Sequence, residues 1–166
     1  AEFAEAAARL QAGTGPFAID TERASGYRYD DRAFLIQIRR NVAGTMLFAP
    51  EGHRAELTQV LAPVLNGHHW IIHAAPSDLP SLGWLGLFPG TLFDTELAAR
   101  FAGFHRTNLG AIIAELFDVQ LEKGHGDDDW SIPRLSEEMR AYAALDVELL
   151  LELATTLRDT LAEQEK

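Results

Sequence analysis

The chain has 166 residues, 47% hydrophobic and 23% charged, which is an ordinary composition for one compact globular domain. It contains no cysteine, which excludes disulfides, zinc–thiolate sites and cysteine nucleophiles, and which fits a reducing cytoplasm. No apolar run reaches the roughly 18 residues that a membrane helix needs, and the acidic start AEFAEAAARL does not resemble a signal peptide.

The charge of the chain leaves the choice of partner open. A formal net charge of −11 argues at first against binding nucleic acid. Yet most of the basic residues are arginines, whose planar guanidinium suits phosphate, and five of them fall in one short stretch: Arg23, Arg28, Arg32, Arg39 and Arg40. The same stretch is more readily explained by surface arginines in a chain of biased composition.

The first half of the chain predicts a helix, a three-stranded meander and a second helix. Helical spacing covers residues 2–11, and the glycines and proline of 13–16 are expected to end that helix. The expected strands lie at 17–20, 34–40 and 45–50, with a polar turn region at 24–32 and a second helix at 53–65 that ends at Asn66–Gly67.

The second half alternates strands and helices. A buried strand is expected at 69–75, and Ser77 is expected to cap a short helix that reaches Leu85. The following elements are a strand that continues as a helix (91–103), a helix capped by Asn108 (109–118), a polar loop (122–134) and one long helix from Ser136 to about Glu163. This order predicts an α/β sandwich around a mixed five-stranded sheet, as a single domain over residues 1–166.

Four acidic residues lie where a strand or a helix can present them to a metal ion. Asp20 and Glu22 are two apart at the end of a predicted strand, so they project from the same face. Asp78 follows a predicted strand, and Tyr142 and Asp146 lie one turn apart on the last helix. Carboxylates are the ligands that Mg²⁺ prefers in phosphoryl-transfer enzymes. Spacing alone does not show that the three segments meet.

These motifs, in this order, resemble the three signatures of the DEDD exonuclease superfamily, in the DEDDy variant with Tyr-x-x-x-Asp. Within it the chain is similar to the ribonuclease D family, through FAIDTE, FLIQI, HAAPSDLPSL, LFDTELAARFAG, the KG…DWS loop and YAALDVELL. The resemblance implies an RNase H-like three-layer fold and the metal-dependent removal of nucleotides from single-stranded RNA 3′ ends, tRNA precursors among them.

The resemblance also implies roles for individual residues. Two Mg²⁺ or Mn²⁺ ions would be bound by Asp20, Glu22, Asp78 and Asp146, and Tyr142 would hold the attacking water. Substrate contacts would come from Arg23, His73 and Lys123. Relatives often have an aromatic residue or histidine where Arg23 stands, so base stacking there would become a guanidinium contact or be lost.

Other polar residues are expected to be structural. Asp94 is expected to hold a strand-to-helix junction, and the acidic run 127–129 to be a solvated loop whose Asp129 and Trp130 shape the wall of the site. His68 and His69 are adjacent and point apart in a strand, so neither is expected to be a ligand.

Two other functions compete with the exoribonuclease. One is a DNA exonuclease, which would share these motifs. Recognition of the 2′-hydroxyl separates RNA from DNA, and no residue of the sequence reveals such recognition. A non-catalytic scaffold that binds nucleic acid or protein would keep the fold without the chemistry. The helical RNA-binding domains typical of ribonuclease D are expected to be absent, so weak affinity and low processivity are predicted, and the oligomeric state stays open.

Overall fold

The structure of the protein, a computed structural model, describes residues 2–24, 26–28, 30–121, 125 and 128–166. The strands are β1 (Thr14–Arg23), β2 (Ala33–Asn41), β3 (Gly44–Phe48), β4 (His69–Ile72) and β5 (Thr91–Asp94). The helices are α1 (Glu2–Ala12), α2 (Arg54–Leu65), α3 (Leu79–Trp84), α4 (Thr95–Ala102), α5 (Leu109–Phe117), α6 (Glu137–Glu148) and α7 (Leu150–Glu163), with a 3₁₀ turn η1 (Ala75–Ser77) before α3.

The five strands form one mixed sheet in the order β3-β2-β1-β4-β5. The hairpin strands β1, β2 and β3 are antiparallel, whereas β4 lies parallel to β1, and β5 lies parallel to β4. The three-layer α/β fold predicted from the sequence is therefore confirmed, with β1 at its centre.

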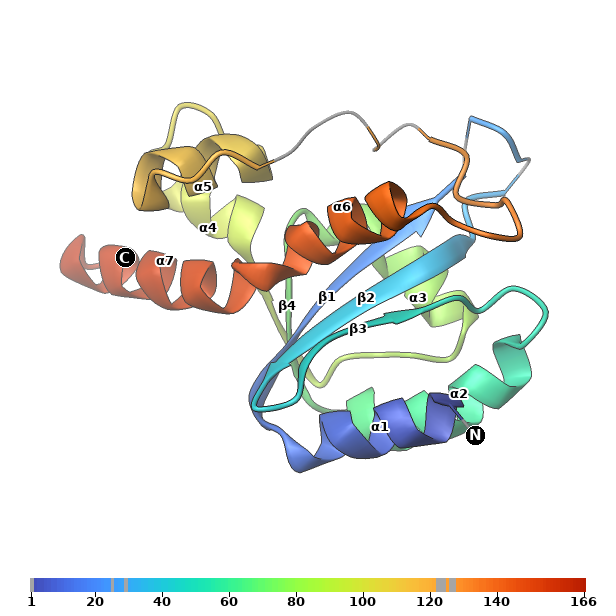
Figure 1. The fold of residues 1–166 in the computed structure, drawn as a ribbon. Helices are drawn as coiled ribbons and strands as arrows, with labels where there is room; N and C mark the ends of the chain where they lie inside the picture. The colour runs from blue at the N-terminus through green and yellow to red at the C-terminus, as the bar shows by residue number, and fades with distance from the viewer. Residues whose placement is uncertain (1, 25, 29, 122–124, 126–127) are drawn as a thin grey trace.

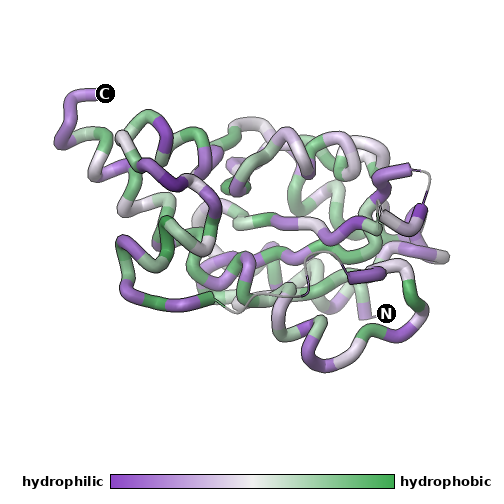
Figure 2. Tube along the Cα trace, turned by 90° about the horizontal axis from the view of Figure 1, so that it is seen from above, coloured by the Kyte–Doolittle hydropathy of each residue, from purple (hydrophilic) through white to green (hydrophobic). Residues whose placement is uncertain are grey.

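Helices cover both faces of this sheet, since α6 and α7 lie on one side and α1 and α2 on the other (Figure 1). Phe17 and Ile19 of β1 belong to the core beneath α1, α2 and α3. Ala18, between them, belongs to the core beneath α4, α5 and α7. Hydrophobic and hydrophilic residues alternate along the outer helices, as expected for helices with one face on a sheet (Figure 2).

The last helix was predicted as one element and is in fact two. α6 ends at Glu148 and α7 begins at Leu150, with Leu149 between them at φ −106° and ψ 1°. No proline or glycine lies at this break. The two helices have different partners, because α6 packs on β1, β2 and β3, whereas α7 packs on α4, β1 and β4. Helical periodicity continues through the break, so the sequence pattern could not show it.

Two smaller predictions are also corrected. Ser77 ends the 3₁₀ turn η1 and does not cap α3, whose preceding residue is Asp78. Strand β1 begins at Thr14, earlier than expected, because Gly15 takes a positive φ of 80° and the pairing with β2 shifts register between Thr14 and Ala18. Gly15 and Pro16 therefore lie within an irregular first part of β1, and not before the strand as predicted.

Candidate metal centre

The first two acids lie on the face of β1 that α6 covers. Asp20 and Glu22 alternate with Ile19 and Thr21, so they share the face of Ala18, away from the α1–α2 core. Glu22 is 7% exposed, and Asp20 pairs across the sheet with Gln37 of β2. Strand β1 thus places two carboxylates in the interior, on the face of the sheet that α6 covers.

Helix α6 brings the last acid to the same place. Its N-terminus is fixed by Ser136, whose hydroxyl oxygen accepts a hydrogen bond from the backbone N–H of Met139 at 3.1 Å. Carboxylate oxygens of Asp20, Glu22 and Asp146 lie within 4.8 Å of one another. Residues more than 120 positions apart therefore converge on a volume that one small ion could fill.

The fourth acid, Asp78, reaches the centre through a different contact. It is 3% exposed and precedes α3, yet within the described residues its side chain makes no capping bond to that helix. Instead its Oδ1 accepts a hydrogen bond from Thr21 Oγ1 at 2.5 Å. The charge of Asp78 raises the pKa of Asp20, so the two carboxyl groups are electrostatic neighbours.

Burial raises the pKa of every acid in this group, and the charges of neighbouring acids raise the pKa of Asp20 and Glu22 further. The pKa of Asp20 lies well above its ordinary value because of burial and then the charges of Asp78, Asp146 and Glu22. Burial, followed by the charge of Asp146, raises the pKa of Glu22 to about 9. Burial raises the pKa of Asp78 to about 6, against the opposing hydrogen bond from Thr21, and it also raises the pKa of Asp146.

Such a set of oxygens fits a hard divalent cation. Carboxylates gathered in a buried site ionise only at a cost, and a bound cation would remove that cost by inverting the local electrostatics. All the donors are oxygens, which suits Mg²⁺ or Mn²⁺ better than soft metals. Asp20, Glu22 and Asp146 are the described residues whose donor atoms already cluster, and Asp78 adjoins them.

Two buried polar residues that hold these acids were not predicted. Thr21 donates to Asp78, as described above, and Gln37 donates from Nε2 to Oε1 of Glu22 at 3.2 Å. The signal for Gln37 was available, since it is an amide within the otherwise apolar stretch 33–38. A buried amide in a central strand needs partners, and the nearest acceptors belong to the site.

Tyr142 lies one helical turn before Asp146, between two aromatic side chains. Its ring stacks on Trp130, with centroids 6.3 Å apart and planes at 27°, and meets His125 edge-on at 5.5 Å. Trp130 is 1% exposed, so it lies in the interior beside Tyr142. Asp129, beside it, accepts a hydrogen bond from the backbone N–H of Ser131 at 3.0 Å.

The three predicted substrate contacts have different outcomes. Arg23 donates to Asp31 Oδ2 at 2.9 Å and to the carbonyl oxygen of Ser77 at 2.6 Å, and its charge lowers the pKa of Asp78, so it borders the site. His73 shares a hydrogen bond of 2.9 Å between Nδ1 and Thr95 Oγ1, and burial lowers its pKa, which favours the neutral ring. Lys123 lies outside the described residues.

Asp94 has the structural role that was predicted for it. Its Oδ1 accepts hydrogen bonds from the backbone N–H groups of Ala74, Glu96 and Leu97, and its Oδ2 accepts from Ala75 N–H. One carboxylate therefore caps α4 and also fixes the connection from β4 to η1, on which His73 lies; Asp78 directly follows η1.

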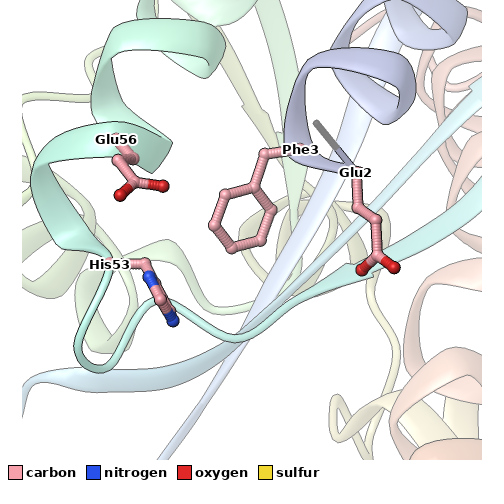
Figure 3. A pocket seen from close by; sticks show the side chains of 4 residues that line it. All are labelled: Glu2, Phe3, His53 and Glu56. Atoms are coloured by element: carbon pink, nitrogen blue, oxygen red, sulfur yellow. The ribbon is translucent and has the colours of Figure 1, made fainter.

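A separate pocket lies on the opposite side of the sheet. It has a volume of about 270 Å³ and is lined by Glu2, Phe3, His53 and Glu56, from the starts of α1 and α2 (Figure 3). The Phe3 ring meets that of His53 edge-on at 6.0 Å. Because α1 and α2 pack on the face away from Asp20 and Glu22, this pocket is not part of the acidic centre.

The mixed sheet and its buried acidic centre define an RNase H-like nuclease domain. The sequence model of the 3′-5′ exonuclease family matches residues 1–162, nearly the whole chain. The chain therefore belongs to the 3′-5′ exonuclease family, and within it the domain is ribonuclease D-like.

Two curated relatives show how far the similarity reaches. The chain is 34% identical to ribonuclease D of Granulibacter bethesdensis over 151 residues, which cover 88% of this chain and 38% of that protein. It is 34% identical to DNA polymerase I of Aquifex aeolicus over 103 residues, 62% of this chain and 18% of the polymerase. The chain thus spans well under half the length of these relatives.

Solved structures are similar over the whole domain. A protein from Bifidobacterium adolescentis has 39% identity and a TM-score of 0.94, covering 99% of this chain and 40% of that one. Escherichia coli RNase D, described as an exoribonuclease involved in structured RNA processing, has 25% identity and a TM-score of 0.82, covering 97% and 43%. Brucella melitensis NrnC with bound Mg²⁺ has 27% identity and a TM-score of 0.79, covering 90% and 75%.

In the part of the chain that the structure describes, no helix has both the length and the apolar character of a transmembrane span.

Proposed function

We propose that this chain is a single metal-dependent 3′-5′ exoribonuclease domain that removes nucleotides from single-stranded RNA 3′ ends. The observation that carries the proposal is the convergence of Asp20, Glu22 and Asp146 from β1 and α6, with Asp78 beside them. Similarity to ribonuclease D supports RNA as the substrate, and NrnC with bound Mg²⁺ supports a divalent cation.

The four acids would hold two divalent cations, Mg²⁺ or Mn²⁺. When bound, such ions would supply Lewis acidity that lowers the pKa of water and offsets charge on the leaving 3′ oxygen. The chain itself supplies the acceptors that fix the ions. Asp78 is held to β1 by Thr21, and Glu22 is held to β2 by Gln37, so that both carboxylates are oriented before a ligand binds.

Tyr142 would orient the attacking water through its hydroxyl group. It lies on the stripe of α6 that carries Asp146, and its stacking on Trp130 restricts the ring to one orientation. Arg23, at the border of the site, would meet a substrate phosphate, and His73, as a neutral ring, would meet phosphate or base. Lys123 would contact the terminal nucleotide, as expected from the resemblance.

The proposal is tested with a 5′-labelled single-stranded RNA, incubated with Mn²⁺ or with EDTA. A ladder that shortens from the 3′ end in Mn²⁺ alone is the expected result. Asp146→Asn should reduce the rate by more than about 100-fold, since even partners of metal ligands are worth 10–100-fold. Asp159→Asn, an exposed aspartate on α7, is the matched control and should retain the wild-type rate. Equal rates for the two variants would refute the assignment of the site.

DNA is the second candidate substrate, and the similarity to DNA polymerase I favours it. A DNA strand of the same sequence, run in parallel, separates the two. Faster degradation of RNA supports the ribonuclease, whereas faster degradation of DNA replaces it. A protein that binds Mn²⁺ and RNA but degrades neither strand would be a scaffold that retains the fold.

A further inference from the structure

Gln37 lies at the centre of β2, with no exposed surface, between the buried residues Ile36 and Ile38. It pairs directly with Asp20 across the sheet, so its side chain points to the face that α6 covers. A buried amide without hydrogen bonds would destabilise the fold, and a valine or isoleucine would serve a central strand better. Its contacts must therefore account for its presence.

Those contacts join three elements at the acidic centre. The amide nitrogen Nε2 donates to Oε1 of Glu22 on β1 and to the carbonyl oxygen of Ala143 on α6, each at 3.2 Å. An amide nitrogen has two hydrogens, and both are used. The carbonyl oxygen of Ala143 can only accept, and Glu22 can only accept once a cation holds it ionised, so the amide is oriented with its nitrogen toward both.

The hydrogen bond to Ala143 connects Gln37 to the helix that carries Asp146. Ala143 is fully buried and follows Tyr142 directly, three residues before Asp146. A bond from Gln37 to its carbonyl oxygen fixes the height of α6 above β2, and the bond to Glu22 fixes the carboxylate below. Together the two bonds link the strand that carries Glu22 to the helix that carries Asp146.

We propose that Gln37 is a positioning residue that sets the spacing of Glu22 and α6, and through it the affinity of the centre for divalent cations. The proposal rests on the proposed function. Carboxylate ligands are usually oriented by such outer partners, and the loss of one typically weakens metal binding by about 10–100-fold.

The test compares Gln37→Met, which keeps the length of the side chain but removes both donors, with Ile38→Val as a matched control. Ile38 is the next residue of β2 and packs on the opposite face, in the α1–α2 core. Both variants should unfold at a lower temperature than the wild type. Calorimetric titration with Mn²⁺ should show an affinity about 10–100-fold weaker for Gln37→Met and unchanged for Ile38→Val.

Activity provides a second readout. The Mn²⁺ concentration needed for half-maximal activity should rise in Gln37→Met by the same factor as the dissociation constant, while kcat at saturating Mn²⁺ recovers to within about threefold. If Gln37→Met does not fold, Gln37→Asn, which is too short to reach both acceptors, takes its place with the same expected shift.

The outcomes distinguish this proposal from the proposed function. If the wild type binds Mn²⁺ and degrades RNA but the Gln37 variant binds Mn²⁺ as tightly as Ile38→Val, the exonuclease stands and Gln37 has only a packing role. If the wild type binds no Mn²⁺, the metal centre itself is refuted, and the role of Gln37 falls with it.

Discussion

Asp146 occupies a position that should destabilise the metal-free protein. Its pKa is raised by burial, and its charge raises the pKa values of Glu22 and Asp20. Asp146→Asn removes one of these repelling charges and keeps the shape of the side chain. In EDTA at pH 8 we expect the melting temperature to rise by a few degrees, since about 1 kcal/mol shifts a domain of this size by about 2–4 °C.

The same substitution should remove the response to metal. Differential scanning fluorimetry with and without Mn²⁺ measures both effects, and Asp159→Asn should resemble the wild type in each. A melting temperature that falls in EDTA would mean that Asp146 stabilises the fold by its own hydrogen bonds and not through a cation.

At this scale the sequence predicted the acids but not the groups that hold them. The order of Asp20, Glu22, Asp78 and Asp146 was readable because each stands in a recognisable motif. Gln37 and Thr21 were missed because their roles depend on which strands pair and which helix lies above them. A single polar residue inside a strand indicates a partner, yet only the tertiary structure supplies it.

At the scale of elements, the connection from β4 to α3 depends on Asp94. The backbone N–H groups of four residues in two segments bond to its carboxylate. Asp94→Ala should reduce the free energy of unfolding by about 2–4 kcal/mol, which combines the loss of a helix cap with unpaired backbone donors. It should also reduce exonuclease activity, because Asp78 lies at the end of the segment that Asp94 fixes.

Asn108→Ala is the matched control, and urea denaturation measures both. Asn108 precedes α5 as Asp94 precedes α4, but among the described residues its side chain makes no capping bond. Its replacement should therefore change the unfolding free energy by less than about 0.5 kcal/mol. Similar losses in the two variants would show that position before a helix, and not the bonds to the β4–η1 connection, determines the effect.

The elements also show where sequence patterns stop being informative. Strands β2 and β3 and helices α2 and α4 were predicted within a few residues, because alternation, periodicity and turn residues agree there. The break between α6 and α7 was not, since it arises from a change of packing partner at Leu149 and leaves no mark in the local sequence.

At the scale of the whole molecule, most of the described contacts of the arginine stretch are hydrogen bonds and ion pairs with other residues of the same chain. Arg40 donates to the carbonyl oxygens of Leu10 and Gly15, and lies over the ring of Phe17 at 4.2 Å. Arg32 pairs with Asp30 and Glu51 at 3.0 Å each. Arg23 remains the member of this stretch that borders the acidic centre, so the negative charge of the chain is offset at the site chiefly by whatever cation binds there.

The stability of the metal-free protein should therefore fall as pH rises. In the folded state the pKa of Glu22 is about 9 and that of Asp78 about 6, against ordinary values of 4.5 and 3.8. Below the ordinary values both states are protonated, and the shifts have no effect. Above them the unfolded chain releases protons that the folded protein retains, so stability decreases from about pH 4.5 upward until the folded-state pKa values are passed.

Divalent cations should reverse this trend, because they bind the ionised carboxylates and displace the retained protons. In EDTA, the midpoint of urea denaturation should fall as the pH rises from 5 to 8.5. The corresponding decrease in unfolding free energy should be on the order of a few kcal/mol. With saturating Mg²⁺ the midpoint should be higher, and the difference should grow with pH. A difference that is the same at every pH would place the cation at a site other than these acids, since only a site that exchanges protons for metal couples the two.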